Sequence, residues 1–272
     1  MSGLARIEAA FGAARAEGRA ALMPYMMGGF PDRDTSMAVA AAYADAGADL
    51  VELGVPFSDP LADGPVIHDA DTRALAAGAT LASTLEVGAS ISGRVPVIAM
   101  VYANMVLARG ATAFAERLAH AGVAGAIVPD LPPEESAEVR DALAKGGMAL
   151  IPLVAPTTPP GRRAQIAREA TGFVYVVSDT RTTGERDEMP AELGELVRAV
   201  QAEASVPAAV GFGIGTPAQA AEVGDVADGV IVGSRLVRAV GEAGEPEAAA
   251  RAVSDFITEA RAAMSGSGLR VG

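Results

Sequence analysis

The 272-residue sequence contains no cysteine, no tryptophan and only two histidines, His68 and His120. Without cysteine the chain cannot form disulfides, thiolate metal sites or a cysteine nucleophile. Neither histidine has a companion at metal-ligand spacing, so we interpret both as ordinary surface or supporting residues. No metal site is therefore expected.

Basic residues are also scarce, because 21 Lys and Arg stand against 34 Asp and Glu, which gives a formal net charge of −13. So acidic a chain is unsuited to a nucleic-acid groove or an anionic membrane surface. Any phosphate ligand must be held by local donors rather than by a general positive field. No apolar run reaches the ~18 residues of a membrane span, and charged residues stand where a signal peptide would be apolar. We expect a soluble cytoplasmic protein.

The sequence does contain a regular alternation of apolar strands and helices. Half of its residues are hydrophobic, and eight apolar runs have the length of buried strands. These runs are 21–27, 49–54, 95–101, 124–128, 148–154, 173–177, 206–212 and 229–232. Strands buried on both faces are typical of a parallel sheet covered by helices. The pattern predicts the α/β class and a (β/α)8 TIM barrel, with a doubly wound open sheet as the alternative.

The two ends of the chain are expected to differ from the barrel units. Residues 2–17 place Leu4, Ile7, Phe11 and Ala14 on one helical face, which predicts an extra N-terminal helix docked as a lid. No linker or composition break divides the chain, so residues 1–264 are expected to form a single barrel domain. The Ser- and Gly-rich residues 265–272 are expected to be a flexible tail.

Residues 51–65, VELGVPFSDPLADGP, combine a strand with a proline-rich loop and carry two acids. By strand alternation Glu52 shares a face with Leu50 and Gly54, which we assign to the barrel interior; a one-residue slip would reverse this. A buried carboxyl must be paired or have a raised pKa, which suits proton transfer near neutral pH. Asp63, in the polar loop, is expected to stay ionised, and the two would form an acid/base pair. Alternatively, Glu52 is a structural ion-pair partner and Asp63 a turn former.

Glycine-rich turns follow the last two predicted strands. Gly211, Gly213 and Gly215 would let the backbone approach a ligand closely, and Thr216-Pro217 predicts a helix start. Gly233-Ser234 offers a second helix start with a hydroxyl. Free amides at such starts suit a phosphate group, which barrels commonly bind after strands seven and eight. Tight structural turns would explain the same glycines, and their spacing does not fit a dinucleotide-binding motif.

The string VELGVPFSDPLADGP resembles the signature of the tryptophan synthase α subunit family, and the resemblance covers most of residues 20–240. Further shared elements are Gly29, Pro31, Tyr102-Ala103-Asn104, Pro129-Asp130-Leu131-Pro132, Tyr175, Thr183-Gly184, Gly211-Phe212-Gly213 and Gly233-Ser234. The resemblance implies a barrel that cleaves indole-3-glycerol phosphate to indole and glyceraldehyde 3-phosphate. It also implies an α2β2 complex with the tryptophan synthase β subunit. That subunit would carry pyridoxal phosphate and receive the indole through a tunnel, and no cofactor is implied in this chain.

The same resemblance implies a role for each site residue. Glu52 matches the proton-transfer residue, Asp63 the acid that hydrogen-bonds the indole nitrogen, and Tyr175 a residue beside the reacting glycerol chain. The residues that would wall the indole are Leu22, Met100, Tyr102, Ile127 and Phe212. Contacts with the phosphate or with Asp63 are implied for Thr183, Gly184, Gly213, Gly233 and Ser234.

One segment departs from the family pattern. Where the family runs Ser-Arg-x-Gly-Val-Thr-Gly, residues 178–184 place Asp179 at the arginine and Arg181 at the first glycine. If that glycine uses positive φ, arginine would be strained there, so we expect loop closure and coupling to the partner to be affected. This leaves open a lyase that works alone and releases free indole. A catalytically weak barrel that regulates a partner, and a different phosphosugar enzyme on this fold, are the remaining alternatives.

Overall fold

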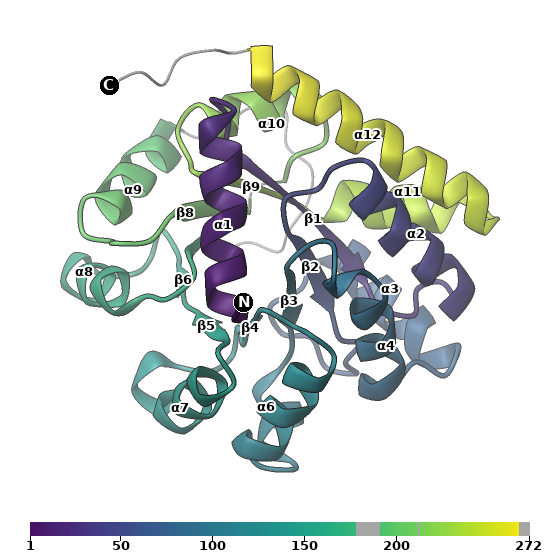
Figure 1. Ribbon diagram of the computed structural model, residues 1–272, viewed down its shortest axis with the longest axis horizontal. Helices are drawn as coiled ribbons and strands as arrows, with labels where there is room; N and C mark the ends of the chain where they lie inside the picture. Colours follow the sequence, from purple (N-terminus) through teal and green to yellow (C-terminus); the bar gives the residue numbers. More distant parts are fainter. Residues whose placement is uncertain (178–190, 212, 267–272) are drawn as a thin grey trace.

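The computed structural model describes residues 1–177, 191–211 and 213–266, whose strands form a parallel barrel surrounded by helices (Figure 1). The strands pair in the order β5-β4-β3-β2-β1-β9-β8-β7-β6. Their bounds are β1 Ala21–Met27, β2 Val51–Gly54, β3 Val97–Met100, β4 Gly125–Ile127, β5 Ala149–Ile151, β6 Leu153–Val154, β7 Val174–Val177, β8 Ala208–Gly211 and β9 Gly229–Val232. The barrel is the predicted fold, and the open doubly wound sheet is excluded.

The two ends of this sheet belong to one predicted strand, 148–154, which is interrupted at Pro152. Its first half, β5, pairs with β4, and its second half, β6, pairs with β7. Proline has no N–H to give to a ladder, so the pairing breaks there. The Pro152 carbonyl still accepts the amide of Tyr175 at 3.0 Å, and the ring of strands closes through this residue.

Helices occupy most of the connections between strands. Their bounds are α1 Gly3–Ala16, α2 Arg33–Asp45, α3 Pro65–Ala76, α4 Leu81–Ser92, α5 Ala103–Leu107, α6 Ala111–His120, η1 Pro133–Glu135, α7 Ala137–Lys145, α8 Pro160–Glu169, α9 Ala191–Gln201, α10 Pro217–Gly224, α11 Ser234–Ala243 and α12 Pro246–Gly266. The flexible tail was expected to begin at residue 265, but α12 includes Ser265 and Gly266. The rest of the expected tail, residues 267–272, lies outside the described residues.

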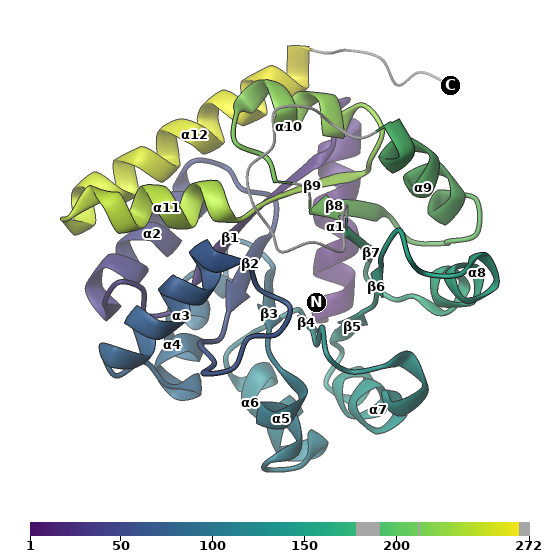
Figure 2. The same cartoon turned by 180° about the vertical axis from the view of Figure 1, so that it is seen from behind.

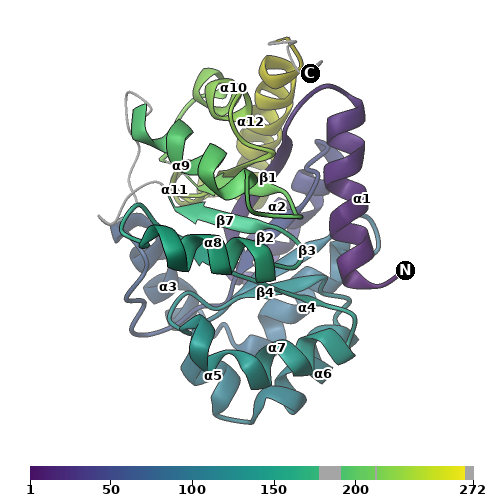
Figure 3. The same cartoon turned by 90° about the vertical axis from the view of Figure 1, so that its left-hand side faces the viewer.

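The helix α1 covers the end of the barrel at which the strands begin, as predicted for the N-terminal lid. Ile7 and Phe11 are buried in the same cluster as the barrel interior, and the Phe11 ring lies 5.6 Å from that of Phe173. Arg6 donates to the backbone carbonyls of Ser92, Val95 and Gly122, which precede β3 and β4. Figure 3 shows α1 from the side, outside the strands, and α1 lies in front of the strands in Figure 1 and behind them in Figure 2. The site loops therefore lie at the opposite end.

A buried ion pair stabilises the end of the barrel at which the strands begin, the end that α1 covers. The Arg19 guanidinium donates to both carboxylate oxygens of Asp49, at 2.5 and 2.8 Å, and Asp49 also accepts the amide of Leu22 at 2.8 Å. Arg261 of α12 reaches the Gly47 carbonyl at 2.6 Å and the Glu17 carboxylate at 2.9 Å. The last helix is thus tied to the segments that open β1 and β2.

No single helix among the described residues is both long and apolar enough to cross a bilayer. The helices α3 and α4 meet that test only when taken together, and they are bent by 107° at the break between them.

Candidate active site

Glu52 lies on the inner face of the barrel, as the alternation predicted. Its neighbour Leu50 packs in the interior cluster, whereas Val51 packs in the cluster between strands and helices. The Glu52 residue is only 1% exposed, and its Oε1 atom is buried without a hydrogen-bond partner in the described part of the chain. A buried polar atom without a partner is costly unless a ligand uses it.

The pKa of Glu52 is raised to about 8, first because burial penalises its charged form and second because Asp63 carries negative charge nearby. At neutral pH the carboxyl is therefore mostly protonated. It can give a proton to a ligand in the barrel and take one back, which is the behaviour of a general acid/base.

Asp63 lies in the loop between β2 and α3 and is held by Tyr102, which precedes α5. The Tyr102 hydroxyl donates to Asp63 Oδ2 at 2.7 Å and accepts the Ala62 amide at 3.0 Å. Burial raises the pKa of Asp63, while the Tyr102 hydrogen bond and the charge of His68 act to lower it. Burial therefore raises the pKa of both acids, although the polar sequence of the loop indicated a more open setting for Asp63.

Two tyrosines flank the acids, and each has its hydroxyl over a glycine of the neighbouring strand. A β-carbon on Gly211 would lie 2.3 Å from the Tyr175 hydroxyl, and one on Gly54 would lie 2.0 Å from the Tyr25 hydroxyl. Burial and the charges of nearby acids raise the pKa of both phenols well above the usual value, so both stay neutral. Gly211 therefore makes room for Tyr175, which is a different reason from the ligand approach expected from the sequence.

Leu22 was expected to wall the indole, and the structure contradicts this. Ala21 and Met23 on either side of it pack in the interior cluster, so the Leu22 side chain points outward to the helices. Tyr25 takes the inner position instead, and in the β1–β2 register it pairs with Glu52. Positions 22 and 25 are an odd number of residues apart, so they point to opposite faces of the strand. The alternation within residues 21–27 was the signal that could have identified Tyr25.

The other residues expected to wall the indole differ in their burial, and one of them lies outside the described residues. Ile127 is fully buried in the barrel interior, and Met100 packs against the same cluster while partly exposed. The Tyr102 ring is stacked on Phe57, with centroids 4.9 Å apart. Phe212 lies outside the described residues.

The glycine-rich turns differ in how many amides they leave open. Thr216 caps α10, and the Gln219 side chain accepts the amides of Gly215 and Thr216 at 2.8 and 3.1 Å, so this helix start is capped by its own side chains. The start of α11, at Gly233 and Ser234, has no side-chain cap hydrogen bond. Amides at that start are thus available to an anion. Thr183 and Gly184, with Asp179 and Arg181, lie outside the described residues.

Asp71 is a third buried acid, which the sequence reasoning missed. It belongs to α3, is 1% exposed, and accepts the Phe57 amide at 3.0 Å through Oδ1. Its pKa is raised to about 7, chiefly by burial, with the Phe57 hydrogen bond opposing the shift and the charge of Asp63 adding to it. Nothing in the polar run around it distinguishes Asp71 from a solvent-facing helix residue.

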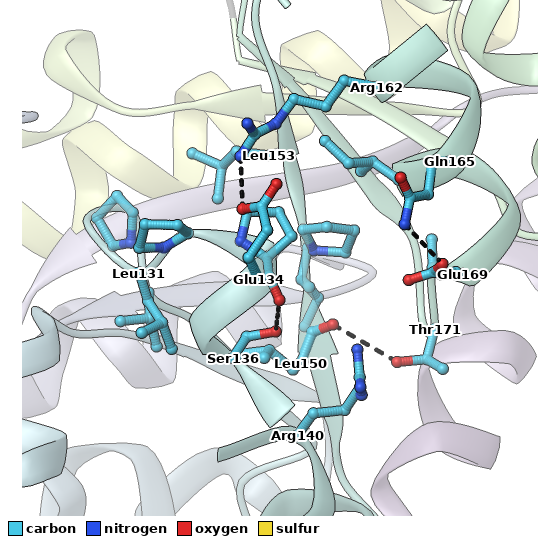
Figure 4. A pocket seen from close by; sticks show the side chains of 18 of the residues that line it. Leu131, Glu134, Ser136, Arg140, Leu150, Leu153, Arg162, Gln165, Glu169 and Thr171 are labelled. Carbon is cyan, nitrogen blue, oxygen red and sulfur yellow. Dashed lines mark hydrogen bonds and ion pairs between the residues drawn. The ribbon is translucent and has the colours of Figure 1, made fainter. Parts of the chain in front are cut away.

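A hollow of about 420 Å³ opens between α7 and α8, away from these acids (Figure 4). It is lined by the segment Leu150–Leu153, where the strand pairing is interrupted, and by Arg162 and Glu134, which form an ion pair of 2.8 Å. None of the predicted site residues belongs to its described lining. Within the part of the chain that the structure describes, no group of three or more His, Cys, Asp or Glu residues could hold a metal ion.

Comparison with known proteins finds one family whose members cover most of the chain. The family model described as tryptophan synthase alpha chain matches residues 11–265. A tryptophan synthase alpha chain from Roseiflexus sp. (strain RS-1) is 45% identical over 261 residues, which is 95% of this chain and 100% of the relative. One from Prochlorococcus marinus (strain MIT 9313) is 47% identical over 237 residues, 86% of each chain.

Solved structures give the same result. A chain of Mycobacterium tuberculosis tryptophan synthase superposes with a TM-score of 0.88 at 38% identity, over 97% of this chain and 99% of the other. The tryptophan synthase subunit alpha of Legionella pneumophila superposes with a TM-score of 0.86 at 35% identity, over 96% of this chain and 98% of the other.

Proposed function

The chain belongs to the tryptophan synthase alpha chain family and is a lyase that cleaves indole-3-glycerol phosphate; on that premise we propose that Glu52 and Asp63 carry the reaction. The observation that carries this assignment is the buried, unpartnered Oε1 of Glu52 on the inner face of the barrel. A proton donor held there without a protein partner is available to the substrate.

The cleavage requires a proton to reach C3 of the indole ring, which leaves positive charge at the ring nitrogen. The bond between C3 and the carbinol carbon then breaks, its electron pair returns to the ring, and the carbinol hydroxyl loses its proton to become the aldehyde. We assign the first proton to protonated Glu52, and the resulting carboxylate takes the second, so that the residue ends as it began. Indole and glyceraldehyde 3-phosphate are the products.

In this proposal Asp63 stabilises the positive charge on the ring nitrogen. Tyr102 holds Oδ2, and the carboxylate accepts the indole N–H, where the positive charge of the intermediate strengthens the hydrogen bond. Tyr175 lies beside the glycerol chain as a neutral phenol. Met100 and Ile127 pack the apolar wall, and Tyr25 takes the place first given to Leu22.

The phosphate is bound in this proposal by the start of α11. The amides that follow Gly233 and the Ser234 hydroxyl supply donors, and the turn at Gly213 lies on the neighbouring strand exit. A dianion held by amides at a helix end needs no general positive field, which fits the net charge of −13.

We further propose that residues 1–264 act as one catalytic domain in the cytoplasm, bound to a tryptophan synthase β subunit in an α2β2 complex. The similar solved structures include five described as tryptophan synthase of M. tuberculosis, two of them in an aminoacrylate-bound form. Pyridoxal phosphate belongs to the β subunit in this proposal and has no role in the steps assigned to this chain.

The test is Glu52→Gln, assayed for indole release from indole-3-glycerol phosphate with and without a β subunit. Gln has nearly the same shape but cannot cycle a proton, so turnover should fall at least ~10²-fold while glycerol 3-phosphate still binds. Glu116→Gln, at an exposed position of α6, is the matched control and should keep full activity. Retained turnover in Glu52→Gln would refute the assignment. Full activity of the parent without the β subunit would instead identify a lyase that works alone.

A further inference from the structure

The loop that carries Asp63 is held by a hydrogen bond to a residue of the following helix. Asp71 lies on α3, which begins at Pro65 immediately after the loop. Its Oδ1 atom accepts the Phe57 amide at 3.0 Å, and its Oδ2 atom is buried with no hydrogen-bond partner in the described part of the chain. A carboxyl group placed this way costs folding free energy, since only one of its two oxygens is satisfied.

Phe57 links this carboxyl to the Asp63 side chain through Tyr102. The Phe57 ring is stacked on the Tyr102 ring, with an interplanar angle of 23° and centroids 4.9 Å apart. The Tyr102 hydroxyl then donates to Asp63 Oδ2 at 2.7 Å. Holding the Phe57 amide therefore holds the ring that orients the phenol, and the phenol fixes one oxygen of Asp63.

Other hydrogen bonds of the loop include those of the Ala62 amide to the Tyr102 hydroxyl at 3.0 Å and of the Asp63 amide to the Pro60 carbonyl at 3.3 Å. Pro56 and Pro60 have no amide hydrogen, and Ser58 and Asp59 are exposed. A segment with so few backbone donors depends on the hydrogen bonds it does make. The Phe57 amide is one of these, and a helix residue rather than the loop itself supplies its acceptor.

We propose that Asp71 is a positioning residue for the cleavage, which sets the orientation of Asp63 through Phe57 and Tyr102. The inference rests on the proposed role of Asp63 at the indole nitrogen. Asp71 does not touch the substrate. Its burial next to Asp63 also makes the two carboxyl groups electrostatic neighbours, so the ionised form of one opposes that of the other.

The test is a double-mutant cycle between Asp71→Ala and Asp63→Asn, read as kcat and KM for indole-3-glycerol phosphate. Asp71→Ala should lower kcat about 10- to 100-fold with a much smaller change in KM, because a misplaced Asp63 costs most in the transition state. In the Asp63→Asn background the same change should have almost no further effect, because the group it positions is already disabled. A purely structural role would lower activity by the same factor in both backgrounds.

Two further variants separate positioning from loss of folding. Asp71→Asn keeps an oxygen acceptor for the Phe57 amide, so its kcat should stay within about threefold of the parent. Asp69→Ala, on the exposed side of the same helix, should leave kcat unchanged. Circular dichroism at the assay temperature checks that each variant is folded.

The outcomes distinguish this inference from the proposed function. If Asp63→Asn keeps the parent kcat, the role of Asp63 fails and the positioning role fails with it. If Asp63→Asn loses activity but Asp71→Ala does not, or if their effects multiply, only the role of Asp71 is overturned.

Discussion

The hydroxyl of Tyr175 occupies the space that a side chain on Gly211 would need, since a β-carbon there would lie 2.3 Å from the phenol oxygen. Tyr175 is on β7 and Gly211 ends β8, and both strands lead into the mouth of the barrel. The glycine therefore determines where the phenol points.

Gly211→Ala should displace the Tyr175 ring and lower kcat by ~10-fold or more, because the phenol would leave the place beside the reacting chain that we propose for it. Steady-state kinetics on indole-3-glycerol phosphate provides the measurement. Gly161→Ala is the matched control, since a β-carbon at that position of α8 meets nothing within 4 Å. Equal activity of the two variants would show that the position of Tyr175 does not matter.

Glu52→Gln should also change how stability depends on pH. The pKa of Glu52 is about 8 when folded and near 4.5 when unfolded, so the unfolded chain loses this proton first as the pH rises. The carboxyl therefore lowers the free energy of unfolding progressively between about pH 4.5 and pH 8. The Glu52→Gln variant does not lose this stability. The difference between its free energy of unfolding and that of the parent should therefore grow in favour of the variant by a few kcal/mol, up to about 4, between pH 5 and pH 9.

Urea denaturation of the parent and variant at both pH values provides this measurement. Comparing the two proteins at each pH cancels the titration of other acids to a first approximation, Asp71 included. An advantage that is the same at pH 5 and pH 9 would contradict a raised pKa for Glu52.

Ser234→Ala should weaken the binding of glycerol 3-phosphate by about 3- to 10-fold, because one donor at the open start of α11 is lost. Thr216→Ala should instead cost about 1 kcal/mol of stability through the lost cap of α10 and leave phosphate affinity unchanged. Isothermal titration and thermal unfolding separate the two effects. If only Thr216→Ala weakened the binding of glycerol 3-phosphate, the phosphate site would be at the start of α10 and not at the start of α11.

Asp49→Ala should destabilise the fold by about 3–5 kcal/mol, because it leaves the buried Arg19 guanidinium without its bidentate partner. Glu134→Ala removes the partner of Arg162 in an exposed pair and should cost about 1 kcal/mol at most. Chemical denaturation measures both. The kcat of folded Asp49→Ala should be that of the parent, and a large loss of kcat would contradict the separation of the barrel's two ends.

The alternation of apolar strands and helices was sufficient to predict the barrel, and the register of β2 was sufficient to place Glu52 inside it. Both are local properties of the chain, because each strand buries its own apolar face. The break at Pro152 was not predicted, since an apolar run does not show which neighbour each half of a strand pairs with.

The misassigned and missed positions depended on tertiary contacts. Asp71 is buried where it accepts the Phe57 amide of the proline-rich loop, and burial raises the pKa of both Asp71 and Asp63. Leu22 was assigned from the family pattern rather than from the alternation of its own strand, which gives the inner position to Tyr25.

The helix α1 covers the barrel at the end where its strands begin. Phe11 packs against Phe173, and Arg6 donates to the backbone carbonyls of the turns there. With that end covered by described residues, the proposed reaction would exchange substrate and products at the end where the strands finish. A partner bound at that end would then determine when indole leaves.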